Sequence, residues 1–171
     1  MKKIYIILSH SGSIPSKFVK TFTHFKYSHV SISLKSNISI MYSFGRKRLN
    51  NPLNGGFIIE KKKGPFYKKF KNTSCLILEL EINNTEYKKL IKELKKYKDK
   101  INIYKYDIFG VVLSIFNIKI DREKYSMCSQ FVGNLLTDSG IYKLNKKIIR
   151  PIDFMDLPNK KIIYEGKLLK Y

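Results

Sequence analysis

The sequence has no tryptophan, no alanine and only two cysteines, Cys75 and Cys128. The cysteines lie far apart and show neither the paired spacing of a zinc site nor the number of a disulfide framework. We therefore expect reduced thiols in a reducing compartment, with no metal and no cofactor. The lack of alanine, beside many lysine, isoleucine and asparagine residues, indicates an AT-rich genome.

Long hydrophobic runs are also missing. The apolar run at residues 4–8 is shorter than the ~7 residues of a signal-peptide core, and polar residues follow it at once. No segment approaches the ~20 apolar residues of a membrane-spanning helix. We expect a soluble, cytoplasmic protein without a signal peptide, unless an unconventional route exports it.

Acidic residues are scarce, and this gives the chain a strong positive charge. Lysine and arginine number 34 against 13 acidic residues, a formal net charge of +21. Such a charge attracts polyanions. The lysines are spread along the chain and arginine, the usual reader of phosphates and base edges, is scarce, so nucleic acid is not an expected partner. An anionic cell-wall polymer or lipid surface remains a candidate, beside a merely solvated surface.

The chain is otherwise typical of a globular protein. Its 171 residues, 43% of them hydrophobic, suffice for one domain over residues 1–171 with a packed core. Apolar or alternating runs predict strands at residues 4–9, 29–34, 38–44, 75–82 and 161–168. In the strand 29–34, Val30 and Ile32 are expected to face the core and the polar residues to face away from it. Residues 38–44 are expected to return as the second strand of a hairpin.

Helical spacing predicts helices that begin near Pro15, at residues 85–98 after Asn84 or Thr85, and from Cys128 to a stop at Gly140. Residues 106–116 form a nearly all-apolar segment that we expect to be a buried helix, although a strand also fits. Residues 45–56 are expected to be a loop and residues 60–74 an exposed connection, apart from a short strand at 57–60. Strand hairpins with inserted helices predict an α+β fold.

Cys128 is placed where a helix is expected to begin, after a candidate cap, Ser126. At the first turn of a helix, unpaired N–H groups and the helix dipole stabilise a thiolate and lower its pKa. The same N–H groups can hold an oxyanion. Cys128 is therefore a candidate nucleophile, although its apolar neighbours also fit an inert buried thiol. Cys75, at the start of an apolar strand, is expected only to pack.

A nucleophilic thiol needs a base, and the chain has three histidines. His24 lies in the first predicted helix and His10 in a loop. His29 begins a strand whose other face is committed to the core, so its imidazole can point into a cleft, although an exposed strand histidine fits the same pattern. Ser43, on the neighbouring strand, is the polar candidate for orienting the imidazole, and an ordinary strand serine is the alternative.

The segments "YSHVSISL", "IMYSFGRK" and "YSMCSQFV" together resemble the circularly permuted papain-like group of NlpC-type cysteine peptidases and amidases. In unpermuted members the cysteine helix precedes the histidine strand, whereas here it follows. The permuted group is related to the lecithin:retinol acyltransferase-like enzymes. The resemblance implies a permuted papain-like fold, with an antiparallel sheet or barrel packed against helices. It also implies Cys128 as nucleophile, His29 as general base and acid, and a polar third residue. Members often have glutamate at that third position, where this chain has Ser43.

Under this resemblance the expected reaction is acyl transfer to Cys128 from an amide in a small peptide or amino-acid-containing substrate, followed by hydrolysis of the thioester. Tyr27 and Tyr125, near the two expected catalytic residues, are candidates to line the substrate pocket. Arg46 and Lys47 are candidates to bind an anionic group such as a carboxylate, with solvated charges as the alternative. A lipid acyl donor and a non-catalytic basic binding module remain open as alternative functions.

Overall fold

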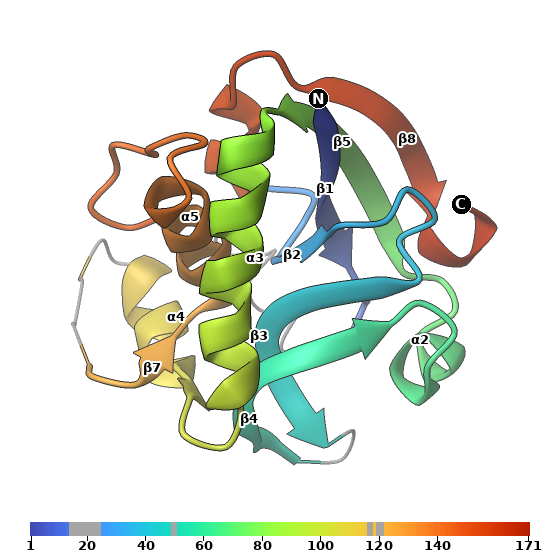
Figure 1. The fold of residues 1–171 in the computed structure, drawn as a ribbon. Coiled ribbons are helices and arrows are strands. Elements are labelled where there is room, and N and C mark those ends of the chain that lie inside the picture. Colours follow the sequence, from blue (N-terminus) through green and yellow to red (C-terminus); the bar gives the residue numbers. More distant parts are fainter. Residues whose placement is uncertain (14–24, 49–50, 116–117, 119–121) are drawn as a thin grey trace.

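The protein is described by a computed structural model that covers residues 1–13, 25–48, 51–115, 118 and 122–171. Its main element is a six-stranded antiparallel sheet in the order β4-β3-β2-β1-β5-β8 (Figure 1). The strands are β1 (Lys2–His10), β2 (His29–Ser33), β3 (Ile40–Arg48), β4 (Asn51–Lys61), β5 (Ser74–Ile82) and β8 (Lys161–Lys167). The α+β class expected from the sequence is confirmed.

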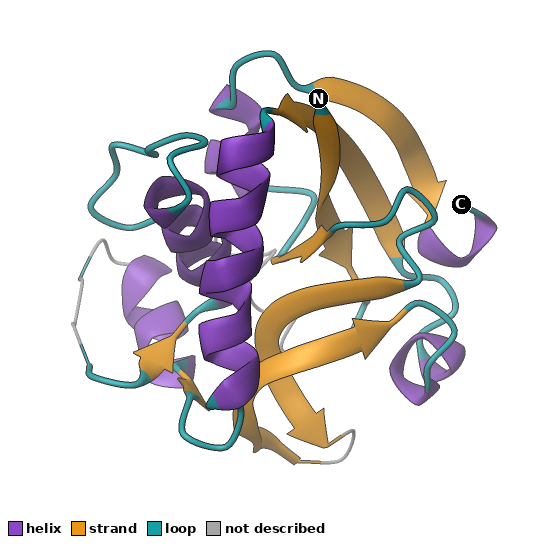
Figure 2. Ribbon diagram, in the orientation of Figure 1, coloured by secondary structure: helices purple, strands orange, loops and turns teal. Residues whose placement is uncertain are grey.

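The helices lie around this sheet, with the two longest on one side of it (Figure 2). They are α2 (Pro65–Lys69), α3 (Asn84–Asp99), α4 (Ile108–Ile115), α5 (Cys128–Asp138) and the 3-10 helices η1 (Pro151–Asp156) and η2 (Leu168–Lys170). A second, two-stranded parallel sheet joins β6 (Lys105–Tyr106) to β7 (Tyr125–Ser126). Among the described helices, none is both long and apolar enough to cross a lipid bilayer.

Both faces of the sheet are buried at β1, which explains why residues 4–8 of this strand are all apolar. Ile4, Ile6 and Leu8 face the larger core under α3 and α5. Tyr5 and Ile7 face a smaller core that α2 and η2 close. The polar face of β2 also lies inside, with Ser31 and Ser33 fully buried. The expectation that this face would lie outside the core is therefore wrong, because α2 and η2 cover it.

An aromatic cluster fixes α3 and α5 against β3 and β4. Its rings belong to Phe44, Phe57, Tyr97, Tyr104 and Phe131, and the Phe44 and Phe131 centroids are 5.2 Å apart. Aromatic pairs of this kind contribute ~0.5–1.5 kcal/mol each beyond the area they bury. The cluster thus holds the start of α5 in a fixed position relative to the β2–β3 hairpin.

The segment 45–56, expected to be a loop, instead forms the ends of β3 and β4. Its glycines are required by close packing and do not mark a turn. A Cβ at Gly55 would lie 2.6 Å from the Cβ of Tyr106, and one at Gly56 would lie 2.2 Å from the Tyr104 carbonyl oxygen. The strands can therefore pass beneath β6 only because these side chains are absent.

The segment 60–74 contains α2, so its description as an exposed connection is also wrong. Tyr67 of this helix is only 2% exposed and packs in the smaller core. Pro65 occupies the first helical position, which its fixed φ favours. The single buried tyrosine is thus held over the sheet by a short helix that is otherwise basic and surface-facing.

The apolar segment 106–116 gives α4, but this helix is not buried as expected. Phe109 is 72% exposed and Val112 is 38% exposed. The sequence period of an apolar helix does not tell whether another element covers it. Here part of the apolar surface of α4 remains open to solvent.

Several local predictions are confirmed. The helix α3 forms where the sequence predicts it, but the predicted cap, Asn84 or Thr85, is wrong: the helix begins one residue earlier because Asn83 caps it in a capping box with Glu86. The helix α5 ends at Asp138, and Gly140 follows with a φ of +75°. The helix predicted to begin near Pro15, with His24 in it, lies outside the described residues.

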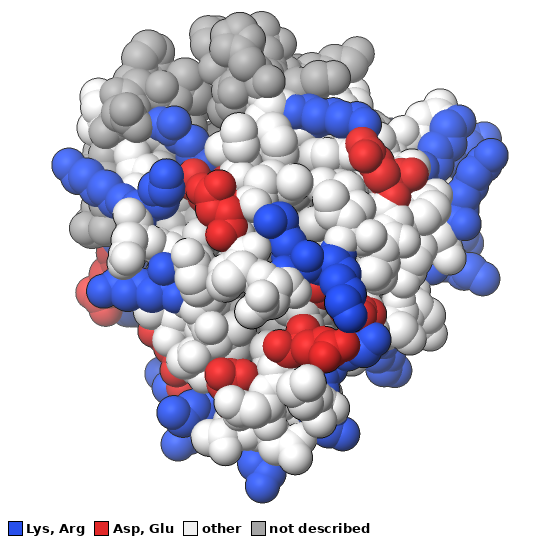
Figure 3. Space-filling view, turned by 90° about the horizontal axis from the view of Figure 1, so that it is seen from above, with Lys and Arg blue, Asp and Glu red and all other residues white. Residues whose placement is uncertain are grey.

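Part of the excess positive charge can be seen on one face of the molecule. On the face shown in Figure 3, lysine and arginine side chains alternate with acidic and neutral ones and do not form one continuous patch. Ion pairs such as Lys3 with Glu79 and Lys96 with Glu93 neutralise part of this charge locally. On this face the distribution fits a solvated surface better than a surface shaped to follow a polyanion.

Candidate active site

Cys128 is the first residue of α5, as the sequence predicts, but Ser126 is not its cap. The N-cap is Met127, whose side chain makes no capping bond. The first backbone bond of the helix runs from Phe131 N to Met127 O. The N–H groups of the first turn therefore have no partner within the helix. Ser126 cannot serve as the cap because its backbone belongs to β7, opposite Tyr106.

The helix is anchored by its buried side. The Ser129 hydroxyl donates to the Ile149 carbonyl at 2.6 Å, and Gly133 lets Ile149 pack directly on the helix. Phe131 and Val132 are fully buried in the larger core. Because this side is fixed, the thiol at the helix start has a defined position.

His29 begins β2, and its ring lies over Gly45 of β3. A Cβ at Gly45 would be 3.8 Å from His29 Cε1 and 2.9 Å from Ile58 Cδ1. Glycine at this position therefore avoids a clash with Ile58, and the imidazole lies at ordinary contact distance beside it. The His29 side chain is 25% exposed, so one part of the ring is open to solvent.

Cys128 and His29 interact with each other by hydrogen bonding and by charge, across almost a hundred residues of sequence. Burial favours the neutral thiol, but His29 and the backbone N–H groups of Val30 and Ser129 outweigh it. The pKa of Cys128 therefore lies below its ordinary value of 9.0. Burial likewise opposes charge on His29, but Glu60 and Cys128 raise the pKa of His29 well above 6.5. Both shifts favour the thiolate–imidazolium pair over the neutral thiol and imidazole.

Glu60 of β4 completes this group of residues. Its Oε1 lies 2.6 Å from His29 Nε2, and its side chain is only 9% exposed. Burial alone raises a carboxyl pKa, yet the charge and hydrogen bond of His29 keep the pKa of Glu60 below its ordinary value. The Tyr67 hydroxyl donates to Oε2 of the same carboxylate. Because Nε2 is held by Glu60, Nδ1 is the ring nitrogen left to exchange a proton with Cys128.

The predicted third residue, Ser43, does not orient the imidazole. Its side chain is fully buried, and its hydroxyl donates to the Val30 carbonyl at 2.6 Å. The strand after β3 supplies the orienting group instead, through Glu60, which lies opposite Met41. One sequence signal marked this position: Glu60 is the only acidic residue before Glu79. It also ends an apolar run, where a carboxylate is expected to be partly buried.

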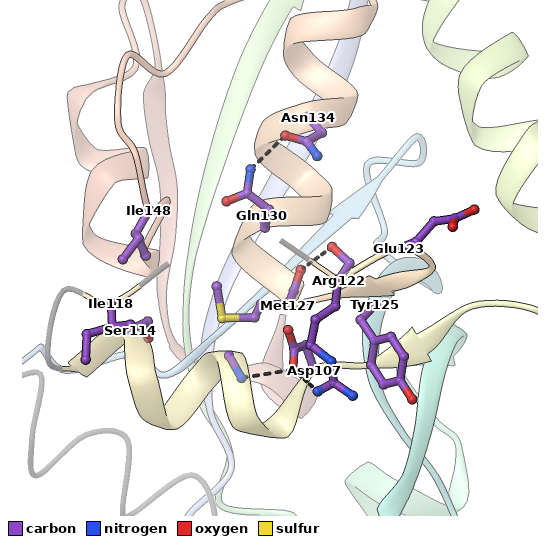
Figure 4. A pocket seen from close by; sticks show the side chains of 12 residues that line it. Asp107, Ser114, Ile118, Arg122, Glu123, Tyr125, Met127, Gln130, Asn134 and Ile148 are labelled. Carbon is purple, nitrogen blue, oxygen red and sulfur yellow. Dashed lines mark hydrogen bonds and ion pairs between the residues drawn. The ribbon is translucent and has the colours of Figure 1, made fainter. Parts of the chain in front are cut away.

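A cavity of about 380 Å³ lies beside the start of α5, between this helix, β7 and α4 (Figure 4). Met127 and Tyr125, close to Cys128 in the sequence, form part of its wall. Gln130 and Asn134 line it from successive turns of α5, and the Gln130 amide donates to Asn134. Asp107 accepts bonds from Arg122 and from the Gly110 backbone. The cavity therefore combines an apolar thioether with fixed polar groups.

The other predicted pocket residues occupy different places. Tyr125 lines the cavity, and Arg122 lies over its ring at 3.8 Å. Tyr27 does not line it, which corrects the prediction: it is 3% exposed in the larger core, and its hydroxyl donates to Glu165 of β8. Arg46 lies on β3, next to the glycine that borders His29.

Comparison with known proteins gives no match, either to a protein-family model or to a curated protein. The chemistry of the site therefore follows from its geometry alone. Within the described residues, no group of three or more histidine, cysteine or acidic side chains is arranged to hold a metal ion. Among the described residues, the reactive groups that this site brings together are the Cys128 thiol on α5, the His29 imidazole on β2 and the Glu60 carboxylate on β4.

Proposed function

We propose that the protein is a cysteine hydrolase that cleaves an amide bond in a small peptide or other amino-acid-containing substrate. The observation that carries this proposal is the continuous series of interactions from Cys128 through His29 to Glu60. Such a series has the nucleophile, the base and the orienting group that acyl transfer requires. Its order along the chain, with the histidine strand first and the cysteine helix last, is that of a permuted papain-like fold.

The first half of the reaction forms a thioester. The Cys128 thiolate attacks the carbonyl carbon, and the carbonyl π electrons move to oxygen. N–H groups at the start of α5 that have no partner within the helix can bind the resulting oxyanion. When the C–N bond breaks, the His29 imidazolium gives its proton to the departing amine, and the thioester remains on Cys128.

The second half regenerates the enzyme. Neutral His29 takes a proton from water, the hydroxide adds to the thioester carbon, and the C–S bond breaks to release a carboxylic acid and the thiolate. Glu60 holds Nε2 throughout and stabilises the imidazolium each time it forms. The absence of a glutamate at the position of Ser43 is therefore no obstacle to catalysis, because Glu60 provides the negative charge beside His29.

The proportions of the site favour small substrates. Cys128 is only 4% exposed, and the neighbouring cavity of about 380 Å³, which Cys128 and His29 do not themselves line, has the volume of a site for a small ligand. A folded polypeptide segment could not bring its backbone to a thiol that is this deeply placed. Amino-acid amides and short peptides fit these limits.

The test is single-turnover chemistry with a panel of acyl-amino-acid p-nitroanilides. The wild-type protein should release nitroaniline and form an adduct on Cys128, seen by intact mass and removed by hydroxylamine. Cys128→Ala should abolish both signals, whereas Cys75→Ser should leave them unchanged. Release that persists in Cys128→Ala would refute the proposal.

A second function, transfer or hydrolysis of a lipid acyl group through the same thiol, is favoured by one observation. The exposed apolar side chains of Phe109 and Val112 lie on α4, which also borders the cavity. Apolar side chains on a basic protein can insert at an anionic membrane surface.

Sedimentation with phosphatidylglycerol–phosphatidylcholine vesicles at low and moderate salt distinguishes this second function. Binding that is lost in Phe109→Ser but kept in Ile162→Ser would favour it, because Ile162 is 57% exposed on the distant edge strand β8. Absence of binding at both salt concentrations would exclude a lipid surface.

A further inference from the structure

Arg46 is held in one place near the candidate active site. Its Nη2 donates to the Ser13 hydroxyl at 2.7 Å. Its guanidinium lies over the rings of Phe66 and Phe70, at 5.3 Å and 5.8 Å from their centroids. These contacts fix a side chain that is otherwise among the most mobile. Lys47, the neighbouring candidate cation, is exposed and donates to the Ile101 carbonyl.

The charge of Arg46 has no partner of opposite sign in the described part of the chain. No carboxylate among those residues forms an ion pair with it, although its side chain is partly buried. Burial lowers the pKa of Arg46, with only Tyr106 opposing that effect. Arginines taken out of solvent are normally paired. A fixed guanidinium with free donors and no acid beside it matches the requirements of an anion that comes from outside.

Tyr106 connects this guanidinium to the nucleophile. Arg46 pairs with Gly55 across the β3–β4 ladder, and the Tyr106 Cβ lies directly over Gly55. Within the small sheet Tyr106 pairs with Ser126, two residues before Cys128. Burial, followed by the charge of Cys128, raises the pKa of Tyr106, so its hydroxyl remains a hydrogen-bond donor. Arg46, Tyr106 and the start of α5 therefore follow one another across the site.

The other side of Arg46 leads to His29. The preceding residue, Gly45, borders the imidazole: a Cβ added there would lie in ordinary contact with His29 Cε1, at 3.8 Å. The helix α2, which provides one of the two rings under the guanidinium, Phe66, also carries Tyr67, the donor to Glu60. Arg46 therefore lies near both Cys128, through Tyr106, and His29, through Gly45.

We propose that Arg46, assisted by Tyr106, binds a carboxylate of the substrate, so that the enzyme prefers acyl donors with a carboxylate a few bonds from the scissile carbonyl. A planar carboxylate is the group that the two-pronged guanidinium matches best. This inference rests on the proposed function for its use of Cys128 as the reacting atom. It narrows the substrates from amino-acid amides in general to those with a free acid group.

The test uses alkylation of Cys128, which needs no knowledge of the natural substrate. N-iodoacetylglycine and N-iodoacetylglycinamide differ only in a carboxylate and a carboxamide, and each forms an S–C bond as iodide leaves. The rate at the Cys128 peptide is followed by mass spectrometry at low salt. The wild-type protein should react about tenfold faster with the acid than with the amide, as expected of one charge-assisted hydrogen bond. High salt should reduce this ratio.

Variants then locate the preference. Arg46→Gln should bring the ratio of the two rates to about one, and Arg46→Lys should retain part of it. Arg48→Gln is the matched control, since it removes the same charge from an exposed position of the same strand and should leave the ratio unchanged. A wild-type ratio near one would overturn the inference, and this measurement does not depend on whether any variant folds. Equal losses of the ratio in Arg46→Gln and Arg48→Gln would also overturn it.

The outcome is separate from that of the hydrolase proposal. If nitroaniline is released but the alkylation ratio does not depend on Arg46, the hydrolase stands and the carboxylate site fails. If the ratio depends on Arg46 but no substrate is turned over, the anion site stands and hydrolysis fails.

Discussion

The two cysteines occupy regions of the molecule that are equally buried and chemically opposite. Cys75 is fully buried and Cys128 is 4% exposed. In the smaller core, burial raises the pKa of Cys75 to about 12. At the start of α5, burial acts in the same direction, but His29 and two backbone N–H groups lower the pKa of Cys128. The comparison shows that the neighbours of a thiol, and not its exposure, decide whether it can be a nucleophile.

The largest expected effect is the difference between the two thiols in native protein. At pH 7 iodoacetamide should label Cys128 at least ~100-fold faster than Cys75, because only the thiolate reacts. The labelling rate of Cys128 should stay high as pH falls from 9 and should decline only below its lowered pKa. The rate for Cys75 should instead rise with pH up to about 12. Equal rates in native protein, with equal rates also in denaturant, would remove the distinction.

The second test removes the base. His29→Gln should slow labelling of Cys128 by roughly 100-fold at pH 7, because burial then raises the thiol pKa without the opposing imidazolium. Cys75 in the same sample is the internal control, since its pKa does not depend on His29. A Cys128 rate that is unchanged in His29→Gln would mean that the helix start alone activates the thiol.

The positions of the proposed nucleophile and base were predictable because local patterns specify them. A cysteine before an apolar helical stripe marks Cys128, and a histidine before an alternating run marks His29. Their contact depends on α5 packing against β2 in the larger core, to which both elements contribute apolar side chains that the sequence patterns identify. The resemblance to the permuted peptidases added the order of these elements.

The third residue was not predictable in the same way. Glu60 reaches His29 only because β3 and β4 pair across a segment rich in glycine and asparagine, which local preferences assign to a loop. The need for Gly55 and Gly56 arises from β6, an element distant in sequence. Tyr67 was missed because a single buried tyrosine in a lysine-rich segment gives no period. Tertiary contacts, not propensity, determine this half of the site.

A third test compares the two candidates for the orienting group. Glu60→Gln should lower kcat by ~10- to 100-fold, because the amide cannot stabilise the imidazolium with a full charge. Ser43→Ala should leave kcat within about twofold and lower stability by ~1 kcal/mol, the cost of one buried hydrogen bond. Steady-state kinetics and urea unfolding measure both. A large loss of kcat in Ser43→Ala, with little loss in Glu60→Gln, would instead identify Ser43 as the orienting residue, as the sequence suggested.

The smallest effect expected is that of Tyr67→Phe, which leaves the thiol, imidazole and carboxylate in place. The hydroxyl of Tyr67 donates to Glu60 and helps keep the pKa of that carboxyl low. Its removal should raise the pKa of Glu60, so that the carboxylate is neutralised at a higher pH as acid is added. The acid limb of the kcat/KM profile should therefore move to higher pH, with a loss of only about two- to fivefold at neutral pH.

The matched control for this last variant is Tyr164→Phe. Tyr164 also packs against the smaller core, but its hydroxyl donates to the Lys167 carbonyl on β8, away from the catalytic group. A general loosening of that core would affect both variants alike and would leave the pH profile unmoved. A shift of the acid limb in Tyr67→Phe alone would instead show that a residue of the smaller core affects Cys128 through Glu60 and His29. The region in which burial makes Cys75 inert would then also help to activate Cys128.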